Sequence, residues 1–507
     1  MEIIKRNILA NFGGSFLIGV MGFIFVPIYL KFLGVEAFGL MGIFGSLLGL
    51  FALLDMGLSS TLNREMARLS VQPDKAQEMR DLLRTLEIPY WLVGVIIAAI
   101  MIFTSPLIAN HWINAKNTSL PSFERAIALM GLCVAFQWPI SLYTGGLMGL
   151  QQQLLVNAIN VAIAIIRGVG AVLVLWLISP TVEAFFLWQI LINGLNVGLL
   201  VYFLWKRIPS ATKPPRFRQS LLRQIWRFAA GMTATSITAT ILMQTDKLLL
   251  SKLLSFEMFG YYVLANTVVS ILYRFIEPVY SAAYPHFTRL VQVGNINELI
   301  LLYHNAAKLV SVLVLPIAVI LSLFSKEIIY LWTRNQLMAS NTHLFISILT
   351  VGTALHCLAH IPYALMLAYR WTRLSLYANI VSIIVLIPLM IVFTKLYGGI
   401  GAAIVWLILN VGCLIVTIPL MYRRLLSNQK WIWYYKDITK PFLAAISIGS
   451  LGRIFITPDW SPWVLSLSIG TLGATTLLGT ALAVDHPRVI RVLKSIIWHR
   501  KRRQKEV

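Results

Sequence analysis

The sequence has little charge for its length. Charged residues make up 12% of its 507 residues and hydrophobic residues 58%. A soluble domain carries about 25% charged residues, roughly twice this share. No segment of the chain has the composition of a soluble domain. The sequence therefore excludes an ordinary soluble protein and indicates one whose buried and lipid-facing surfaces are both apolar.

Cysteine is also scarce. Cys133, Cys357 and Cys413 all lie inside apolar segments, without the spacing of redox or zinc motifs. They are most simply small packing residues. The sequence lacks a phosphate-binding loop, and its glycine-rich segment Gly398–Gly401 joins two apolar runs rather than a strand and a helix. We therefore expect no cofactor, no metal site and no catalytic residues.

Acidic residues are few, 19 against 42 basic residues, so the formal net charge is +23. The basic residues concentrate in short segments between apolar runs, which argues against nucleic acid as a partner. Basic segments beside transmembrane helices remain cytoplasmic, where anionic membrane lipids attract them. We therefore predict that both termini are cytoplasmic. The most basic segments are 206–227, 423–440 and 488–505.

Long apolar runs are abundant. A transmembrane helix needs about 20 apolar residues, and the sequence contains about fourteen runs that meet this requirement. The expected fold class is therefore all-α, a polytopic membrane protein. The expected helices cover residues 9–30, 38–60, 87–108, 126–148, 155–178, 184–205, 229–250, 259–283, 308–331, 344–368, 375–395, 398–421, 441–457 and 462–483.

An internal repeat is visible in the loops between the predicted helices. Lys, Leu, Glu, Phe and Gly recur at identical spacing in Lys31–Gly39 and Lys252–Gly260. Six helices per repeat would give both copies the same orientation, with a cavity between two lobes. The predicted domains are an N-lobe (1–205), a cytoplasmic amphipathic linker (206–228), a C-lobe (229–421), and a C-terminal part (422–507). This last part holds a cytoplasmic loop, helices 13 and 14 and a basic cytoplasmic tail.

Several short motifs accompany the repeat. They are Asn11, Pro27-x-Tyr29, Leu33-Gly34, Phe38-Gly39-Leu40, Leu54-Asp55-Met56-Gly57-Leu58, Asn63-Arg64, Gly146-x-x-Gly149-Leu150-Gln151, Asp246-Lys247 and Phe259-Gly260-Tyr261-Tyr262. Together they resemble the bacterial polysaccharide flippase family, of the O-antigen and capsule type, within the MATE-like (MOP) superfamily.

The resemblance implies a function and a location. A member would move an undecaprenyl-pyrophosphate-linked oligosaccharide from the inner to the outer leaflet of the bacterial inner membrane, by alternating access between two pseudo-symmetric lobes. Its partners would be this lipid-linked oligosaccharide, a coupling ion (H⁺ or Na⁺) and polysaccharide assembly proteins. Fourteen helices rather than twelve leave a lipid II-type flippase open. A MATE-type drug or cation antiporter is a further alternative, and a membrane polysaccharide polymerase is disfavoured by the short outer loops.

Ionisable residues at membrane depth are costly and usually face a polar interior. Arg167 is the leading candidate for the substrate headgroup, because arginine donates two parallel hydrogen bonds to phosphate and no acid lies within one turn. A structural arginine that pairs across helices is the alternative. Arg274 is a second candidate, although Glu277 at i+3 could neutralise it, or release it when a headgroup arrives.

The predicted seventh and second helices contribute further candidates. Lys247 could bind the headgroup or reach the membrane interface as a snorkelling side chain. Asp55 and Asp246 could bind a coupling ion, cap helix ends or pair with basic neighbours. His356 and His360, at i and i+4, share a helix face. A metal site is disfavoured because the glutamate of an HExxH motif is missing, so they are a polar pair or a proton relay.

Aromatic residues offer a weaker signal. Trp138, Tyr143, Tyr273 and Tyr280 could stack on sugar rings, or could belong to the aromatic belts at the membrane interfaces. The segment 217–229 alternates arginine with apolar residues and predicts an amphipathic helix on the cytoplasmic surface, which would link the two lobes.

Overall fold

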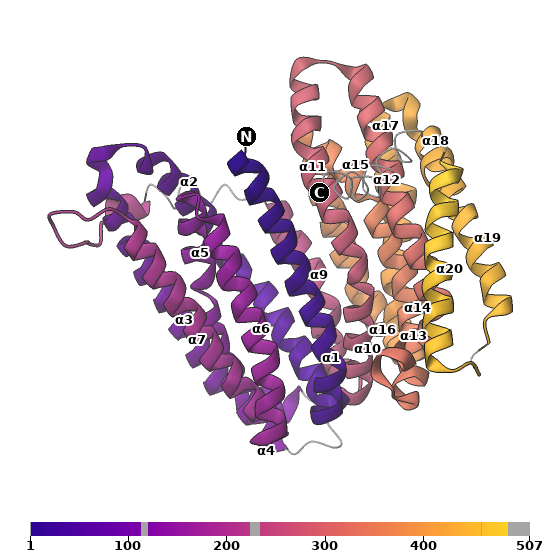
Figure 1. Ribbon diagram of the computed structural model, residues 1–507, viewed down its shortest axis with the longest axis horizontal. Coiled ribbons are helices and arrows are strands. Elements are labelled where there is room, and N and C mark those ends of the chain that lie inside the picture. The colour runs from indigo at the N-terminus through magenta and orange to yellow at the C-terminus, as the bar shows by residue number, and fades with distance from the viewer. Residues whose placement is uncertain (1, 113–119, 224–233, 458, 485–507) are drawn as a thin grey trace, which may run out of the picture. The chain divides into compact units, whose positions relative to one another are not determined.

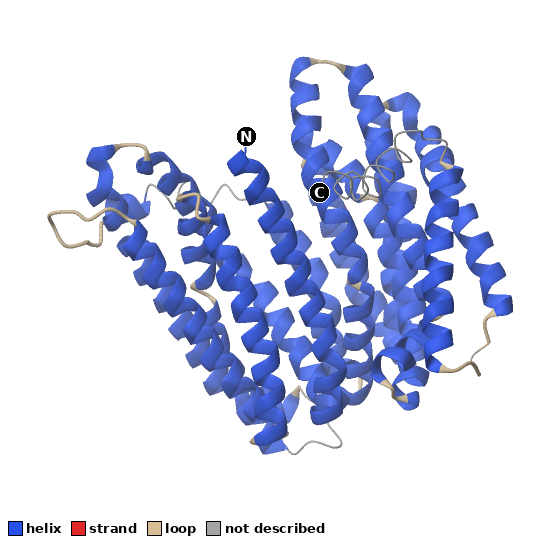
Figure 2. Ribbon diagram, in the orientation of Figure 1, coloured by secondary structure: helices blue, strands red, loops and turns tan. Residues whose placement is uncertain are grey.

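The computed structural model describes residues 2–112, 120–223, 234–457 and 459–484. Helices are the only regular elements in these ranges (Figure 2). The chain divides into two compact units, Met1–Gly260 and Tyr261–Val507. The all-α, multi-pass fold class predicted from the sequence is confirmed by these helices and their apolar lengths.

Nearly all described residues of the first unit are helical (Figure 1). They are α1 (Glu2–Phe51), the 3₁₀ turn η1 (Ala52–Asp55), α2 (Leu58–Ser70), the 3₁₀ turn η2 (Pro73–Lys75), α3 (Ala76–His111), α4 (Leu120–Gln137), α5 (Ile140–Gly149), α6 (Gln153–Leu177), α7 (Val182–Arg207), α9 (Ala234–Leu253) and the start of α10 (Phe256–Val269).

The second unit begins within α10 and includes two π-helical segments. Its elements are α11 (Ile271–Val293), α12 (Ile296–Leu323), α13 (Ser325–Thr333), α14 (Gln336–Leu358), α15 (His360–Ala368), α16 (Arg373–Gly412), the π-helix η3 (Cys413–Thr417), α17 (Ile418–Arg424), the 3₁₀ turn η4 (Ser427–Gln429), α18 (Lys430–Ile432), the π-helix η5 (Trp433–Thr439), α19 (Lys440–Phe455) and α20 (Pro462–Ala483).

Eleven segments of the described chain are long and apolar enough to cross a membrane. Two of the longest contain a glycine with non-helical backbone, Gly34 in α1 (φ 79°) and Gly398 in α16 (φ 60°). Glycine adopts positive φ without a steric penalty, so each of these segments is two helices joined at a kink. The sequence predicts separate helices at both places: 9–30 and 38–60 on either side of Gly34, and 375–395 and 398–421, the second of which begins at Gly398. A total of fourteen helices stays a prediction.

Two of the predicted helices are bent rather than continuous. The predicted helix 126–148 is α4 and α5, with a break before Ile140, and the predicted helix 344–368 is α14 and α15, with a break at Ala359. A proline lies at or just after each break: Pro139 in the first and Pro362 in the second. Proline lacks the N–H that would bond the carbonyl four residues earlier, so it interrupts the helical ladder.

The two copies of the repeat motif contact each other within the first unit. A Cβ atom on Gly39 would lie 3.3 Å from the rings of both Phe256 and Phe259, and one on Gly260 would collide with the main-chain oxygen of Val35. Glycine at these equivalent positions allows the backbones of α1 and α10 to approach closely. The recurrence of Gly39 and Gly260 in the sequence therefore has a packing reason.

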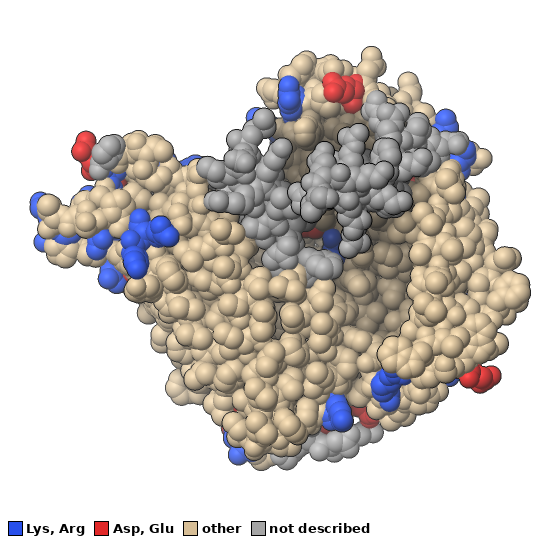
Figure 3. All heavy atoms as spheres, in the orientation of Figure 1, with Lys and Arg blue, Asp and Glu red and all other residues tan. Residues whose placement is uncertain are grey.

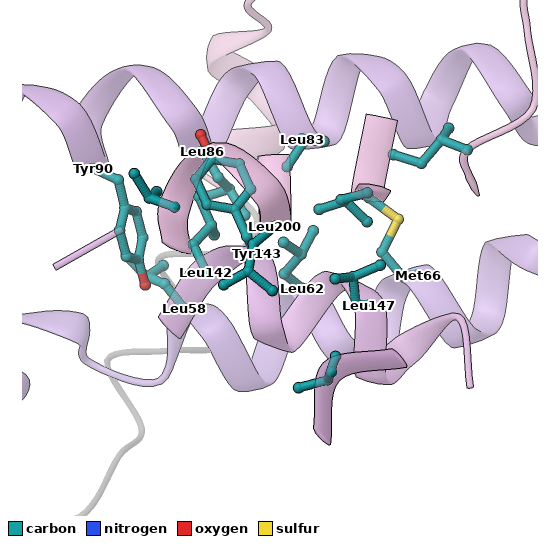
Figure 4. Close-up of a cluster of buried hydrophobic side chains, with 14 of the residues drawn as sticks. Leu58, Leu62, Met66, Leu83, Leu86, Tyr90, Leu142, Tyr143, Leu147 and Leu200 are labelled. Atoms are coloured by element: carbon teal, nitrogen blue, oxygen red, sulfur yellow. The ribbon is translucent and has the colours of Figure 1, made fainter. Parts of the chain in front are cut away.

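The core of the first unit is an apolar cluster between α2, α3, α5 and α7. Leu62, Met66, Leu83 and Leu200 are fully buried in it, and Figure 4 shows these side chains in one cluster with Tyr143. The cluster packs these four helices against one another at the ends that are predicted to be cytoplasmic. Burial of each such side chain contributes about 1.5–3 kcal/mol relative to exposure in water.

The segment that follows α7 lies along α3. The carboxylate of Asp81, which is fully buried, accepts from the main-chain N of Arg216 (2.9 Å) and forms an ion pair with Nη2 of Arg218 (2.6 Å). The main-chain N of Arg218 donates to Thr85 Oγ1 at 3.0 Å. The amphipathic helix predicted over 217–229 is described only as far as residue 223, and residues 224–229 lie outside the described residues.

Two polar pairs attach the C-terminal helices to the rest of the second unit. His304 Nδ1 of α12 bonds to Oδ2 of Asp437 in η5, and His304 Nε2 lies 3.0 Å from Gln429 Oε1. At the other end of α19, Arg453 Nη1 lies 2.7 Å from Glu327 Oε1 of α13. The helices α19 and α20, which correspond to the predicted helices 441–457 and 462–483, are thus part of the second unit.

Candidate functional site

Arg167 lies in the middle of α6 and contacts polar groups of neighbouring helices. Its Nη2 donates to Asn193 Oδ1 of α7 at 2.8 Å. The amide nitrogen of Asn193 donates in turn to Gln137 Oε1 (3.3 Å) and to the main-chain oxygen of Cys133 (3.4 Å), both on α4. We call Arg167, Asn193 and Gln137 the Arg167 cluster. It joins three helices through uncharged amides.

The guanidinium of Arg167 has no carboxylate within 4.0 Å among the described residues. Its Nε is buried and has no hydrogen-bond acceptor. A cation held this way keeps both its charge and part of its donor capacity. The planar guanidinium fork matches the oxygens of phosphate and carboxylate groups. The arrangement can therefore receive an anionic group, and the predicted headgroup role of Arg167 stays a prediction.

Asp55 occupies a helix end. Its Oδ2 accepts from the main-chain N of Gly57 (3.1 Å) and from Ser59 Oγ (2.9 Å) at the start of α2. Its Oδ1 accepts from the hydroxyl of Tyr90 and from Ser141 Oγ (3.5 Å). These contacts hold Asp55 at the start of α2, and its role as a coupling or a structural acid stays a prediction. They connect η1, α2, α3 and α5.

Asp246 and Lys247 lie next to each other in α9. Asp246 is buried, 7% exposed, whereas Lys247 is half-buried and its Nζ lies 3.4 Å from the main-chain oxygen of Met243. The predicted roles of these two residues, in headgroup binding and ion coupling, remain predictions. Their helix packs against α1 within the first unit.

Arg274 and Glu277 are both exposed on α11, and no ion pair joins them. Glu277 Oε1 instead accepts from Ser281 Oγ at 3.4 Å. Arg274 is therefore not neutralised by Glu277 in this structure. It keeps its charge available to an anion that reaches this face of α11.

The two predicted histidines lie at the bend between α14 and α15, among aromatic rings. The centroids of His356 and His360 are 4.9 Å apart, and the Tyr273 hydroxyl lies 3.2 Å from His356 Nδ1. Tyr280 packs against His360 (6.2 Å) and Trp406 against His356 (5.7 Å). We call these five residues the histidine–tyrosine cluster. It offers ring faces and hydrogen-bonding groups in one place.

Tyr273 and Tyr280 therefore belong to a polar aromatic cluster, whereas the other two predicted stacking residues are core residues. Trp138 stacks on Tyr90 at 5.5 Å, and the buried hydroxyl of Tyr143 accepts from Trp91 Nε1 at 3.0 Å. Within the described ranges, no group of three or more His, Cys, Asp or Glu residues is placed to hold a metal ion.

Comparison with known protein families shows which family the chain belongs to. The model of the polysaccharide biosynthesis protein family matches residues 4–291, which is more than half of the chain. The chain belongs to this family. The MatE family model matches residues 232–392. Membership in the MOP superfamily, inferred above from short motifs, is thereby confirmed.

Several known proteins resemble the chain over most of its length. A protein of Shigella flexneri described as a candidate O-antigen transporter is 21% identical over 409 residues, covering 80% of this chain and 94% of its own. A solved structure of the lipid II flippase MurJ superimposes with a TM-score of 0.68 at 14% identity, covering 94% of this chain and 98% of MurJ. An inward-facing multidrug resistance MATE transporter gives a TM-score of 0.65 at 14% identity, covering 81% and 96%.

Sequence reasoning missed several polar residues of this family member. His304 and Asp437 lie between predicted helices, in the segments 284–307 and 422–440, yet both are buried in helices. Asn193, which holds Arg167, lies in an apolar run and carries no charge to mark it. A single polar amide in a predicted transmembrane helix was the only available signal.

Proposed function

We propose that the chain moves an undecaprenyl-pyrophosphate-linked oligosaccharide from the inner to the outer leaflet of the bacterial inner membrane. The product would serve O-antigen, capsule or exopolysaccharide synthesis. Family membership and the similarity to the Shigella flexneri protein support this proposal. The fold shared with a lipid II flippase and MATE transporters supports a transport mechanism rather than enzymatic catalysis.

The single observation that carries the proposal is the unneutralised cation of Arg167. The polyprenyl tail can remain in lipid, but the hydrated pyrophosphate has to cross about 30 Å of hydrocarbon. A cation at membrane depth lowers this barrier, because it replaces part of the water that the anion loses. Arg167 meets this need, since amides rather than a carboxylate hold its guanidinium. In the same proposal Arg274 and Lys247 contribute further positive charge along the route.

The histidine–tyrosine cluster would serve the sugar part of the substrate. Aromatic faces and hydroxyl or imidazole groups together suit the apolar faces and hydroxyls of a sugar ring. A proton relay through His356 and His360 is the second role we propose for it, with H⁺ or Na⁺ as the coupling ion. Asp246 and Glu277 are the remaining acids proposed for coupling.

Transport would occur by alternating access of two lobes, 1–205 and 229–421, joined by the linker 206–228. The remaining residues, 422–507, would add the last helices and a basic tail. We propose cytoplasmic termini for this arrangement, because most basic residues then lie on the cytoplasmic side. The partners would be the lipid-linked oligosaccharide, membrane lipids and polysaccharide assembly proteins.

Two other transport functions have specific support. The MatE family match and the MATE fold favour a drug or cation antiporter. The larger coverage and TM-score of the MurJ superposition favour a lipid II-type flippase. An organic cation would be repelled by the unneutralised Arg167, so we rank the antiporter below a carrier of anionic lipid-linked sugars.

The test is complementation of a deletion strain with Arg167→Ala, scored by surface glycan. We expect surface glycan to be abolished while the protein still accumulates in the membrane. Arg125→Ala is the matched control, because Arg125 is an exposed arginine of the same unit, paired with Glu183 at 3.2 Å. Normal surface glycan in the Arg167→Ala strain would refute the headgroup role.

Organic-cation resistance and cell-wall synthesis are measured in the same deletion strain. Loss of resistance with unchanged surface glycan would favour the antiporter. Arrested growth with accumulated cell-wall precursor would favour the lipid II-type flippase.

A further inference from the structure

Two arginines and one tryptophan form a compact group on the first unit. Arg80 and Arg84 lie one turn apart in α3, and their Cζ atoms lie 5.3 and 5.2 Å from the ring centroid of Trp205 in the last turn of α7. Both distances are within the range of cation–π attraction. Trp205 Nε1 donates to Glu87 Oε1 at 2.8 Å, which fixes the plane of the indole.

Positive charge exceeds negative charge in this group. Arg84 pairs with Glu87 at 3.1 Å, but Arg80 has no carboxylate within 4.0 Å among the residues that the structure describes. The Nε of Arg80 is buried without an acceptor, and its Nη1 donates only a long bond, 3.4 Å, to the oxygen of Pro209. The carboxylate of the neighbouring residue, Asp81, is already bound by Arg216 and Arg218 of the linker segment.

The next residue of α7 adds a further cation. Lys206 Nζ lies 3.3 Å from the Tyr202 hydroxyl and 5.4 Å from the centre of its ring, and it has no acidic partner within the described chain. Figure 3 shows Lys and Arg side chains gathered at one end of the first unit. Lys206 follows Trp205 in the chain, so three cations and two amphipathic aromatic rings lie where α3 and α7 meet, and the acids beside them are Glu87 and the linker-bound Asp81.

Apolar side chains continue from this group along both helices. On α3, Ile88, Leu92 and Val95 follow Arg84 at helical spacing and are 48%, 57% and 59% exposed. The corresponding stripe on α7 runs toward Tyr202 and is 45–60% exposed; it consists of Leu187, Leu191 and Leu195. Exposed apolar stripes of transmembrane helices face lipid chains. The cations thus lie where a lipid headgroup meets its acyl chains.

We propose that Arg80, Arg84, Trp205 and Lys206 form a binding site for the phosphate of an anionic phospholipid in the cytoplasmic leaflet. The two guanidinium groups would donate to the phosphate oxygens, while the indole lies at the interface, the depth that tryptophan prefers. The acyl chains would lie on the stripes of α3 and α7. Cytoplasmic placement follows from the proposed orientation, and anionic lipids are enriched in that leaflet.

A phospholipid fits this site better than the transported molecule does. The stripes are exposed on the surface of the unit, so a lipid here stays in the bilayer while its headgroup is bound. A binding role of this kind needs no transport cycle. The proposal therefore stands or fails separately from the flippase function.

The test is native mass spectrometry of the purified full-length protein with phosphatidylglycerol, phosphatidylcholine and undecaprenyl pyrophosphate as separate probes. We expect the Arg80→Ala/Arg84→Ala protein to bind phosphatidylglycerol roughly tenfold more weakly than wild type. The matched control is Arg64→Ala/Arg68→Ala, which removes the same charge from two exposed arginines bound to Glu65. We expect the control to bind within about twofold of wild type, because a rim charge contributes little affinity.

A single substitution tests the site in case the Arg80→Ala/Arg84→Ala protein does not fold. Arg84 has a side chain that is 45% exposed, so Arg84→Gln should fold, and we expect about threefold weaker phosphatidylglycerol binding from the loss of one charged donor. Unchanged binding by folded Arg84→Gln protein would overturn the site. An equal loss in both double variants, or wild-type binding of phosphatidylcholine as tight as that of phosphatidylglycerol, would also overturn it. So would a loss confined to undecaprenyl pyrophosphate, which would assign these residues to the substrate.

Discussion

Arg167 in the first unit and Asp437 in the second are both ionisable residues within helices, but their surroundings differ. Asp437 is fully buried and its Oδ2 is bonded to His304 Nδ1, so each of these two ionisable groups has the other as a partner. Arg167 is held by the neutral amide of Asn193 and keeps its charge. A paired ionisable group is explained by the architecture that it stabilises. A charged group without an ionic partner calls for a ligand, and this contrast is the basis of the proposed function.

The largest stability effect is expected from Asp437→Ala. The substitution leaves a buried His304 with only Gln429 as a partner and should cost about 3–5 kcal/mol, the scale for breaking a buried ion pair. Thermal unfolding of the purified protein in detergent measures this loss. Arg167→Ala is the comparison variant and should unfold near the wild-type temperature. Equal destabilisation by both substitutions would remove the distinction between paired and unneutralised groups.

Arg453→Met should have an intermediate effect. It leaves the buried carboxylate of Glu327 without its partner, at a cost of about 1–3 kcal/mol. Arg453 is 37% exposed, so water offsets part of the loss. Hydrogen–deuterium exchange should increase in α13 and α19 and remain unchanged in the first unit. Exchange that rises evenly along the chain would show that this pair does not anchor α19.

Asn193→Ala should sharpen the role of Arg167 with a smaller change. The charge remains but its hydrogen bond is lost, a loss of about 1 kcal/mol, so we expect partial rather than complete loss of surface glycan. Asn196→Ala is the matched control, a buried amide one turn along α7 that does not contact Arg167. A stronger glycan defect in Asn196→Ala than in Asn193→Ala would contradict the positioning role.

The smallest effect concerns Glu65, which lies outside the spans. Burial acts to raise the pKa of Glu65, but Arg68 and Arg64 outweigh it and hold the pKa below its usual value of 4.5. The stabilisation is therefore complete above pH 4.5 and is lost as the pH falls through the lowered pKa. Glu65→Gln should lower the unfolding temperature slightly at pH 7 and leave it unchanged at the acidic end. A difference that grows on acidification would have the wrong sign.

Much of the fold could be predicted because its signals are local. Apolar runs locate the helices, and the kinks at Gly34 and Gly398 lie in or next to the gaps between predicted helices. The bends before Ile140 and at Ala359 were less visible. Pro139 and Pro362 lie inside apolar runs that are long enough to be single helices, so length alone favoured continuity.

The candidate site was only partly predictable. Arg167, His356 and His360 stand out because charge or imidazole inside an apolar run is rare. Their partners do not stand out: Asn193 is an uncharged amide, and Tyr273 is one of 18 tyrosines. Glu277 lies at a suitable spacing from Arg274, yet the two residues do not pair.

Composition and hydropathy alone determined that this protein is a helical membrane protein, and short motifs determined its family. Both follow from properties of contiguous segments, because insertion depends on apolar length and on flanking charge. Only the tertiary structure decided that His304 meets Asp437, 133 residues away, and that Asn193 holds Arg167. Helix packing selects such partners. The sequence alone does not show which distant groups come into contact.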